Sequence, residues 1–122
     1  MGRSELLSVQ TNSVDLHNED DQINQIGSLI FQGCPNLTLL DPSFGGFSGL
    51  TISADGRRLS AVTDRGDWVH FLPAHVSTGR LTGIDDAQIG RLKNPGGKPL
   101  GAKRDSDAES LITIDGGFAV SF

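Results

Sequence analysis

The chain has 122 residues, with 16 glycines, no tyrosine and one tryptophan, and its formal net charge is −5. This length suits one domain and excludes two of ordinary size, the glycines disfavour a helical bundle, and the charge disfavours non-specific binding to nucleic acid or anionic membranes. The single cysteine, Cys34, excludes an internal disulfide and any zinc site that needs two thiolates.

Residues 1–22 are polar and acidic, and they predict a flexible N-terminal arm ahead of a domain that spans residues 23–122. The start of the chain has no apolar core segment, so no signal peptide is visible in it. No apolar run approaches the ~20 residues that a membrane helix needs. Expressed as written, the chain is expected in the cytoplasm.

Short apolar runs separated by turn residues predict strands along the rest of the chain. In order, the predicted strands are residues 23–31 (or a short helix), 37–40, 47–53, 58–63, 68–72, 87–89, 110–114 and 118–122. Pro73 is expected to end the fifth of them, and residues 94–104 are expected to form an irregular loop rich in Gly, Pro and Lys.

One pattern occurs twice, about sixty residues apart. Ser48–Val62 and Glu109–Val120 each contain an alternating apolar run, an Asp-Gly turn and a second apolar run. Asp-Gly between such runs indicates a hairpin, and repetition at this spacing is typical of a propeller blade or another β-repeat. The predicted fold is all-β: a partial β-propeller of about two antiparallel blades with long irregular loops. Because such units cannot bury both faces alone, we expect exposed strand edges and self-association.

The first group of residues that can carry chemistry is the turn Asp64-Arg65-Gly66-Asp67. An aspartate that closes a strand can ligate a cation, and Arg65 can bind a phosphate or a carboxylate through two parallel hydrogen bonds. The simpler interpretation is turn chemistry, in which aspartate caps the turn and Gly66 adopts a positive φ. The turn alone does not decide between them.

A second group is acidic. Asp105, Asp107 and Glu109 alternate along a segment predicted to be extended, so their carboxylates can share one face. Clustered acids repel one another unless a cation or an arginine lies among them, and hard oxygen ligands suit Ca²⁺ or Mg²⁺. A solvated acidic loop fits the spacing equally well. Basic residues precede the acids and either bind a phosphate or neutralise them: Lys93, Lys98, Lys103 and Arg104.

Motifs of nucleophilic and nucleotide-binding enzymes are missing from the sequence. It contains no G-x-S-x-G, P-loop, dinucleotide fingerprint or HExxH. His70 in a predicted strand and His75 after Pro73 have no recognisable serine partner, so a Ser/His/Asp triad is not expected.

Two blocks of the sequence occur together in a recognisable order, FGGFSGLTISADGRRLSAVTDRGDW and then DAESLITIDGGFAVSF. With the lead-in IGSLIFQGCPNLTLLDPSFGG, they resemble the esterase-like/phytase-like domain family of bacteria from about Ile26 to Phe122. The chain departs from the family pattern at Ser110, where the family has glycine. It ends at Phe122, where family members continue with further blades, so an N-terminal fragment is expected.

The resemblance implies a β-propeller, an exported and usually periplasmic protein, and hydrolysis of a phosphoester or a carboxylic ester. Carried over by position, it implies that the catalytic residues are Asp64, Arg65, Asp107 and Glu109. The expected substrate is a small anionic ester. A metal ion, with Ca²⁺ as the candidate, would be held by Asp64, Asp105, Asp107 and Glu109. Little or no turnover is expected from this chain alone. Two alternatives stay open: a non-enzymatic propeller that binds a ligand or partner through its loops, and an inactive remnant.

Overall fold

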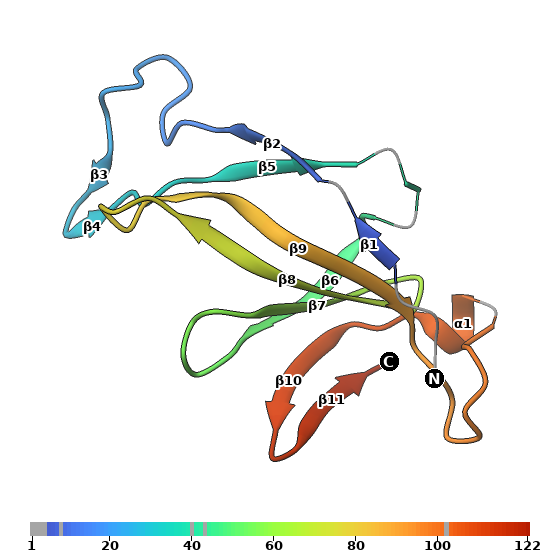
Figure 1. Ribbon diagram of the computed structural model, residues 1–122. Coiled ribbons are helices and arrows are strands. Elements are labelled where there is room, and N and C mark those ends of the chain that lie inside the picture. Colours follow the sequence, from blue (N-terminus) through green and yellow to red (C-terminus); the bar gives the residue numbers. More distant parts are fainter. Residues whose placement is uncertain (1–4, 8, 40, 43, 102) are drawn as a thin grey trace.

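The computed structural model describes residues 5–7, 9–39, 41–42, 44–101 and 103–122, with the side chains of residues 5–7, 103 and 104 left out. The described chain consists of antiparallel strands and one helical turn (Figure 1). The elements are β1 (Glu5–Leu7), β2 (Gln10–Ser13), β3 (Gln25–Ile26), β4 (Leu29–Ile30), β5 (Pro35–Thr38), β6 (Phe47–Ile52), β7 (Leu59–Thr63), β8 (Asp67–His75), β9 (Leu81–Arg91), α1 (Lys103–Ser106), β10 (Ser110–Ile114) and β11 (Gly117–Ser121). The predicted all-β class is confirmed, and the sheets of the described residues stay open, as in part of a propeller.

Both predicted Asp-Gly hairpins form. In the first, β6 pairs with β7, and the Asp55 carboxylate accepts hydrogen bonds from the Ser53 hydroxyl (2.5 Å) and the Arg57 N–H (3.0 Å). Gly56 follows with a φ of +72°, a conformation that glycine adopts without strain. In the second hairpin, β10 pairs with β11 across Asp115 and Gly116. The local sequence therefore determines both turns.

The largest sheet has the order β1-β9-β8-β7-β6. Along β8 and β9, alternate apolar side chains point to one face and form a buried cluster of Val69, Phe71, Ala87 and Ile89. Phe44 packs against this cluster, and the β2–β5 pair lies over β9 on the same side (Figure 1). This face therefore carries the larger part of the core.

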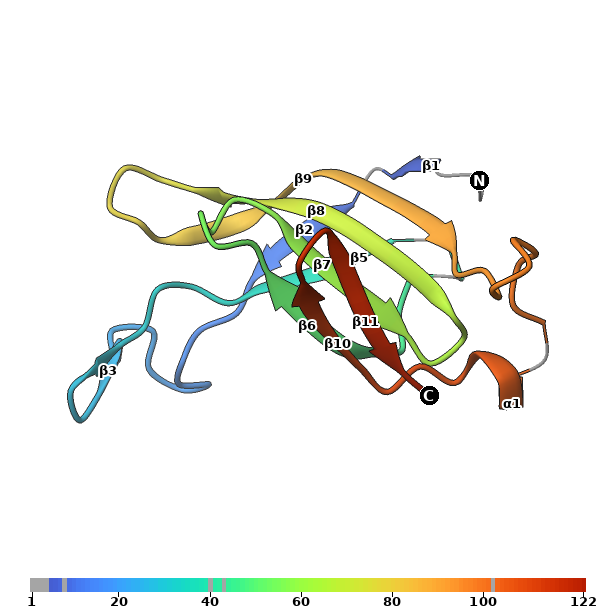
Figure 2. The same ribbon diagram turned by 90° about the horizontal axis from the view of Figure 1, so that it is seen from below.

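The opposite face of the sheet is covered by the β10–β11 hairpin, which lies across β6 and β7 (Figure 2). Val62 on β7 packs there with Ala108 and Leu111. The approach is close, because a Cβ placed on Gly49 would lie 2.8 Å from the Leu111 nitrogen. The two hairpins of the sequence repeat are thus stacked on each other.

Strands β8 and β9 are longer than predicted. The expected stop at Pro73 is wrong, since β8 continues to His75, and β9 covers eleven residues where only 87–89 were predicted. Pairing between β7 and β8 ends at Phe71, so Pro73 lies where β8 has no neighbour on that side and its missing N–H costs little. A bulge at Asp86, with a φ of +50°, shifts the register, and β8 and β9 remain paired on both sides of it.

The predicted N-terminal arm contains two paired segments. β1 pairs with β9 and β2 pairs with β5, whereas residues 14–22 form no strand. The predicted strand 23–31 is divided into β3 and β4 by a turn at Gly27. Among the described residues, no helix has the length and apolar character that crossing a lipid bilayer requires.

Candidate functional site

The Asp64–Asp67 turn is stabilised by hydrogen bonds to Thr63, the last residue of β7. Thr63 is fully buried, and its Oγ1 accepts hydrogen bonds from the backbone N–H groups of Arg65 (3.3 Å) and Asp67 (3.1 Å). Gly66 donates its N–H to the Thr63 carbonyl (3.0 Å) and has a φ of +84°. The expected glycine conformation is confirmed, and a threonine hydroxyl caps the turn.

Asp64 lies against the glycine pair that precedes β6. Its backbone N–H donates to the Gly46 carbonyl (2.9 Å), and its Oδ1 is buried. Gly46 has a φ of +64°, and a Cβ at this position would overlap the Asp64 carboxylate. Glycine is therefore required at position 46, because its backbone packs directly on this carboxylate.

Arg65 is exposed at the tip of the turn. Its Nη1 donates a hydrogen bond to the Pro42 carbonyl (2.6 Å), which fixes one side of the guanidinium. A guanidinium carries five N–H donors in a planar fork, so this bond is compatible with binding an anion as well.

No sequence pattern indicated that Arg91, at the end of β9, belongs to the candidate site. It lies opposite Asp67 in the β8–β9 register, and its Nη1 forms an ion pair with the Asp67 carboxylate (3.2 Å). Nη1 also donates to the Arg65 carbonyl, while Nε and Nη2 donate to the Leu100 carbonyl (3.2 and 3.1 Å). Arg91 therefore ties the Asp64–Asp67 turn to the loop that leads into α1. A correct prediction of the length of β9 would have revealed this pair.

The second sequence block reaches the same end of the sheet. Ser106, the last residue of α1, is 1% exposed and lies under the turn, where a Cβ on Gly66 would be 2.7 Å from the Ser106 Cβ. The Ser48 hydroxyl donates to the Ala108 carbonyl, sixty residues away. The Asp64–Asp67 turn and the Ser106–Glu109 segment are therefore neighbours, although about forty residues separate them.

The acids do not lie as predicted. Asp105 belongs to the helical turn α1, so the expected alternation along an extended segment is wrong. Asp107 is half-buried, and Glu109 is exposed just before β10. The Lys103 and Arg104 side chains lie outside the described part of the structure. Within that part, no three His, Cys, Asp or Glu residues gather closely enough to hold a metal ion.

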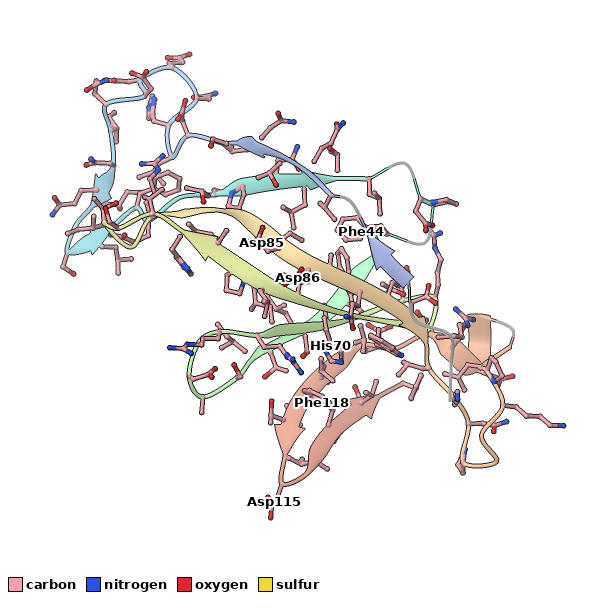
Figure 3. All side chains as sticks on the ribbon, viewed as in Figure 1. Phe44, His70, Asp85, Asp86, Asp115 and Phe118 are labelled. Atoms are coloured by element: carbon pink, nitrogen blue, oxygen red, sulfur yellow. The ribbon has the colours of Figure 1, made fainter. Side chains whose placement is uncertain are left out.

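A separate polar pair lies on the sheet face that β10 and β11 cover. Ser60 and His70 face each other across β7 and β8, with 2.8 Å between Oγ and Nδ1. The His70 ring lies between Trp68 (4.8 Å between centroids) and Phe118 (5.8 Å), and Figure 3 shows His70 and Phe118 side by side. Burial, followed by the nearby Arg58 charge, holds the pKa of His70 below its usual value of 6.5.

Acid is expected to weaken the fold through His70. Because the pKa of His70 is lowered by folding, the unfolded chain takes up a proton more readily. This contribution to stability is fully present above pH 6.5, the usual histidine pKa, and is lost as the pH falls below it. Urea unfolding at a pH of about 8 and of about 5 measures the loss. His70→Gln should reduce the loss and His75→Gln, at an exposed site, should not; equal losses in both variants would contradict the assignment.

The comparison with known families extends over most of the chain. The family model described as "Phytase-like: esterase-like activity of phytase" matches residues 42–122. The match contains both sequence blocks and does not include residues 26–41, which the resemblance described above also covers. No curated protein and no solved structure matches the chain.

Proposed function

The chain belongs to the phytase-like family, and from this premise we propose that its Asp64–Asp67 turn and Ser106–Glu109 segment form a binding site for a small anionic ester, to be hydrolysed there. The close contact of Gly66 with Ser106 carries the proposal, because it brings the two family blocks to one end of the sheet. Phosphoesters and carboxylic esters both fit the chemistry of the site.

Each residue of the site has a role that follows from its place. Arg65 is exposed on the turn and binds the phosphate or carboxylate group of the ester. Asp107, half-buried beside the turn, takes a proton from the attacking water as general base. Glu109, exposed just before β10, passes a proton taken up from solvent to the leaving oxygen, and Asp107 afterwards releases its proton to solvent. Asp64, enclosed by the Gly46 backbone, orients the turn.

A calcium ion is the cofactor that these acids would take, but the described residues do not form its site. Ca²⁺ prefers six to eight oxygen ligands, and no step of the proposed hydrolysis is routed through it. Calorimetric titration of the chain with CaCl₂ is expected to show weak or no binding. Tight binding that is lost in Asp107→Asn would contradict this expectation and restore calcium to the mechanism.

Ligand binding is the first test of the proposed site. Replacing Arg65 with glutamine is expected to weaken the binding of inorganic phosphate at least about tenfold, because a charge-assisted hydrogen-bond pair is lost. Chemical-shift titration of the folded chain measures this. Arg57→Gln is the matched control, since Arg57 lies in the distant β6–β7 turn and should leave the affinity unchanged. Equal effects of both substitutions would show non-specific attraction and contradict the site.

Turnover is the second test. Hydrolysis of p-nitrophenyl phosphate by this chain is expected to be slow, because Arg65 and Glu109 are exposed and water screens their charges. Whatever activity exceeds the buffer rate should disappear in Asp107→Asn. If phosphate binds through Arg65 and no hydrolysis occurs, the site is a binding site, as in the non-enzymatic alternative. If Arg65 binds no phosphate and Asp107→Asn changes no activity, the proposed function is wrong.

The non-enzymatic alternative draws support from one observation. Apolar side chains on the two stacked hairpins are exposed, a feature typical of surfaces that bind a partner or associate with a second copy. The most exposed of them are Leu50, Ile52, Ile112, Ile114 and Phe122. Sedimentation velocity over a range of concentrations tests for self-association.

Export to the periplasm is a further part of the proposal that rests on the family, and fractionation of host cells tests it.

A further inference from the structure

We propose that Ser60 and His70 form a nucleophile and base pair that accepts the acyl group of small, uncharged carboxylic esters. The pair lies on the face of the sheet, three residues along β8 from Asp67 and so roughly 10 Å from the turn. This inference does not rest on the anionic-ester site proposed above. The two sites use different residues and can fail independently.

The β7–β8 hairpin positions the pair. Its register places Ser60 directly opposite His70, and Val62 opposite Trp68, on one face. Ser60 and His70 are ten residues apart in the sequence, and no nucleophile motif surrounds Ser60. The distance from Ser60 Oγ to His70 Nδ1 is 2.8 Å, which is within the range for a hydroxyl that donates to an imidazole base.

The pair opens into a cavity between the sheet and the β10–β11 hairpin. The cavity has a volume of about 170 Å³, enough for a short acyl ester and too small for a large one. Apart from the pair itself, its walls are apolar and include Trp68, Leu111, Phe118 and Val120. Such walls favour an uncharged ester and disfavour a phosphate.

The surroundings of His70 favour its neutral form, which is the form a general base requires. Burial and the charge of Arg58 act against the imidazolium. Arg58 and Asp86 are the charged groups that line the adjoining pocket together with His70. With Nε2 carrying the ring proton, Nδ1 is the acceptor for the Ser60 hydroxyl.

The chemistry balances without a further reactant. Ser60 Oγ attacks the ester carbonyl carbon as its proton passes to His70 Nδ1. The bond to the leaving oxygen then breaks, the proton of His70 moves to that oxygen, and an alcohol departs. Water attacks the acyl-serine by the reverse proton route, which releases the carboxylic acid and restores Ser60. No oxidant, reductant or metal ion takes part.

A purely structural role for the pair makes a different prediction. A hydrogen bond to His70 also satisfies the hydroxyl of Ser60, which is only 4% exposed. In that case Ser60 should react no faster than other serines of the chain. Ser53 provides the matched control, since its hydroxyl donates to the Asp55 carboxylate (2.5 Å) at an exposed turn.

The experiment treats the intact chain with p-nitrophenyl acetate and locates the acetyl group by mass spectrometry of proteolytic peptides. We expect acetylation of Ser60, absent in Ser60→Ala and retained in Ser53→Ala. His70→Gln should slow the acylation at least about 100-fold, the usual contribution of a general base. Circular dichroism of each variant verifies that it is folded.

Two further readouts separate the possible outcomes. In the unsubstituted chain, the acylation rate should increase as the pH is raised and should reach its plateau before the pH reaches about 6.5. The reason is that folding lowers the pKa of His70, so that His70 loses its proton early. This pH profile is measured on the unsubstituted chain, so it tests the proposal even if one of the variants does not fold. Arg57→Gln, in the exposed β6–β7 turn, should leave the acylation rate unchanged. Acetylation confined to lysines or exposed serines, or a rate that His70→Gln does not alter, would overturn the proposal.

Discussion

Replacing Gly66 with alanine is expected to lower the free energy of unfolding by about 2–5 kcal/mol. A residue with a side chain at its φ of +84° costs about 1–2 kcal/mol of backbone strain. The new Cβ would also lie 2.7 Å from the Ser106 Cβ, and both Gly66 and Ser106 are buried, so overpacking adds about 1–3 kcal/mol. Urea unfolding measures the sum.

Gly56→Ala is the matched control for this substitution. Gly56 has a similar φ, +72°, but a Cβ there would meet nothing within 4 Å. Its cost should therefore be the strain alone, about 1–2 kcal/mol. The difference between the two variants measures the contact between the turn and α1. Equal costs would show that Gly66 and Ser106 are not packed together.

Replacing Arg91 with methionine is expected to cost about 2–4 kcal/mol. The substitution removes the donors to the Arg65, Leu100 and Gly101 carbonyls and leaves the Asp67 carboxylate without its ion-pair partner. Asp67 is only 8% exposed, and a buried charge that loses its partner is costly. The side chain of Arg91 is 31% exposed, which reduces the expected loss below that of a fully buried pair.

Arg57→Met provides the comparison for this loss. Arg57 is exposed in the β6–β7 turn, and its substitution should change the free energy of unfolding by less than about 0.5 kcal/mol. Adding Asp67→Asn to Arg91→Met should recover part of the loss, because the uncompensated charge is then removed. Additive losses in the double variant would contradict the ion pair as the main cause.

Local patterns predicted the hairpins because they depend on few residues. Asp55-Gly56 and Asp115-Gly116 each determine a turn, and the alternating runs beside them determine which side chains share a face. The extent of β9 could not be read in the same way. Its pairing with β8 continues past Pro73 only because β7 has already ended, which is a property of the whole sheet.

The candidate site was predicted in part, for the same reason. The residue types around Asp64–Asp67 indicated the turn and its glycine, and the repeat indicated that the two blocks belong together. The position of Asp105 in a helical turn was not visible, since four residues carry too little periodicity to distinguish a helix from an extended segment. Ser60 and His70 were missed because only the hairpin register brings them together.

We propose that the Asp64–Asp67 turn after β7 and the Ser106–Glu109 segment form one site. Nuclear Overhauser contacts in the folded chain test this most directly. Contacts are expected between the Gly66 α-protons and the Ser106 β-protons, and between the methyl groups of Val62 and Leu111. A spectrum with the cross-strand contacts of β6–β7 and β10–β11 intact, but with none between the two blocks, would contradict it.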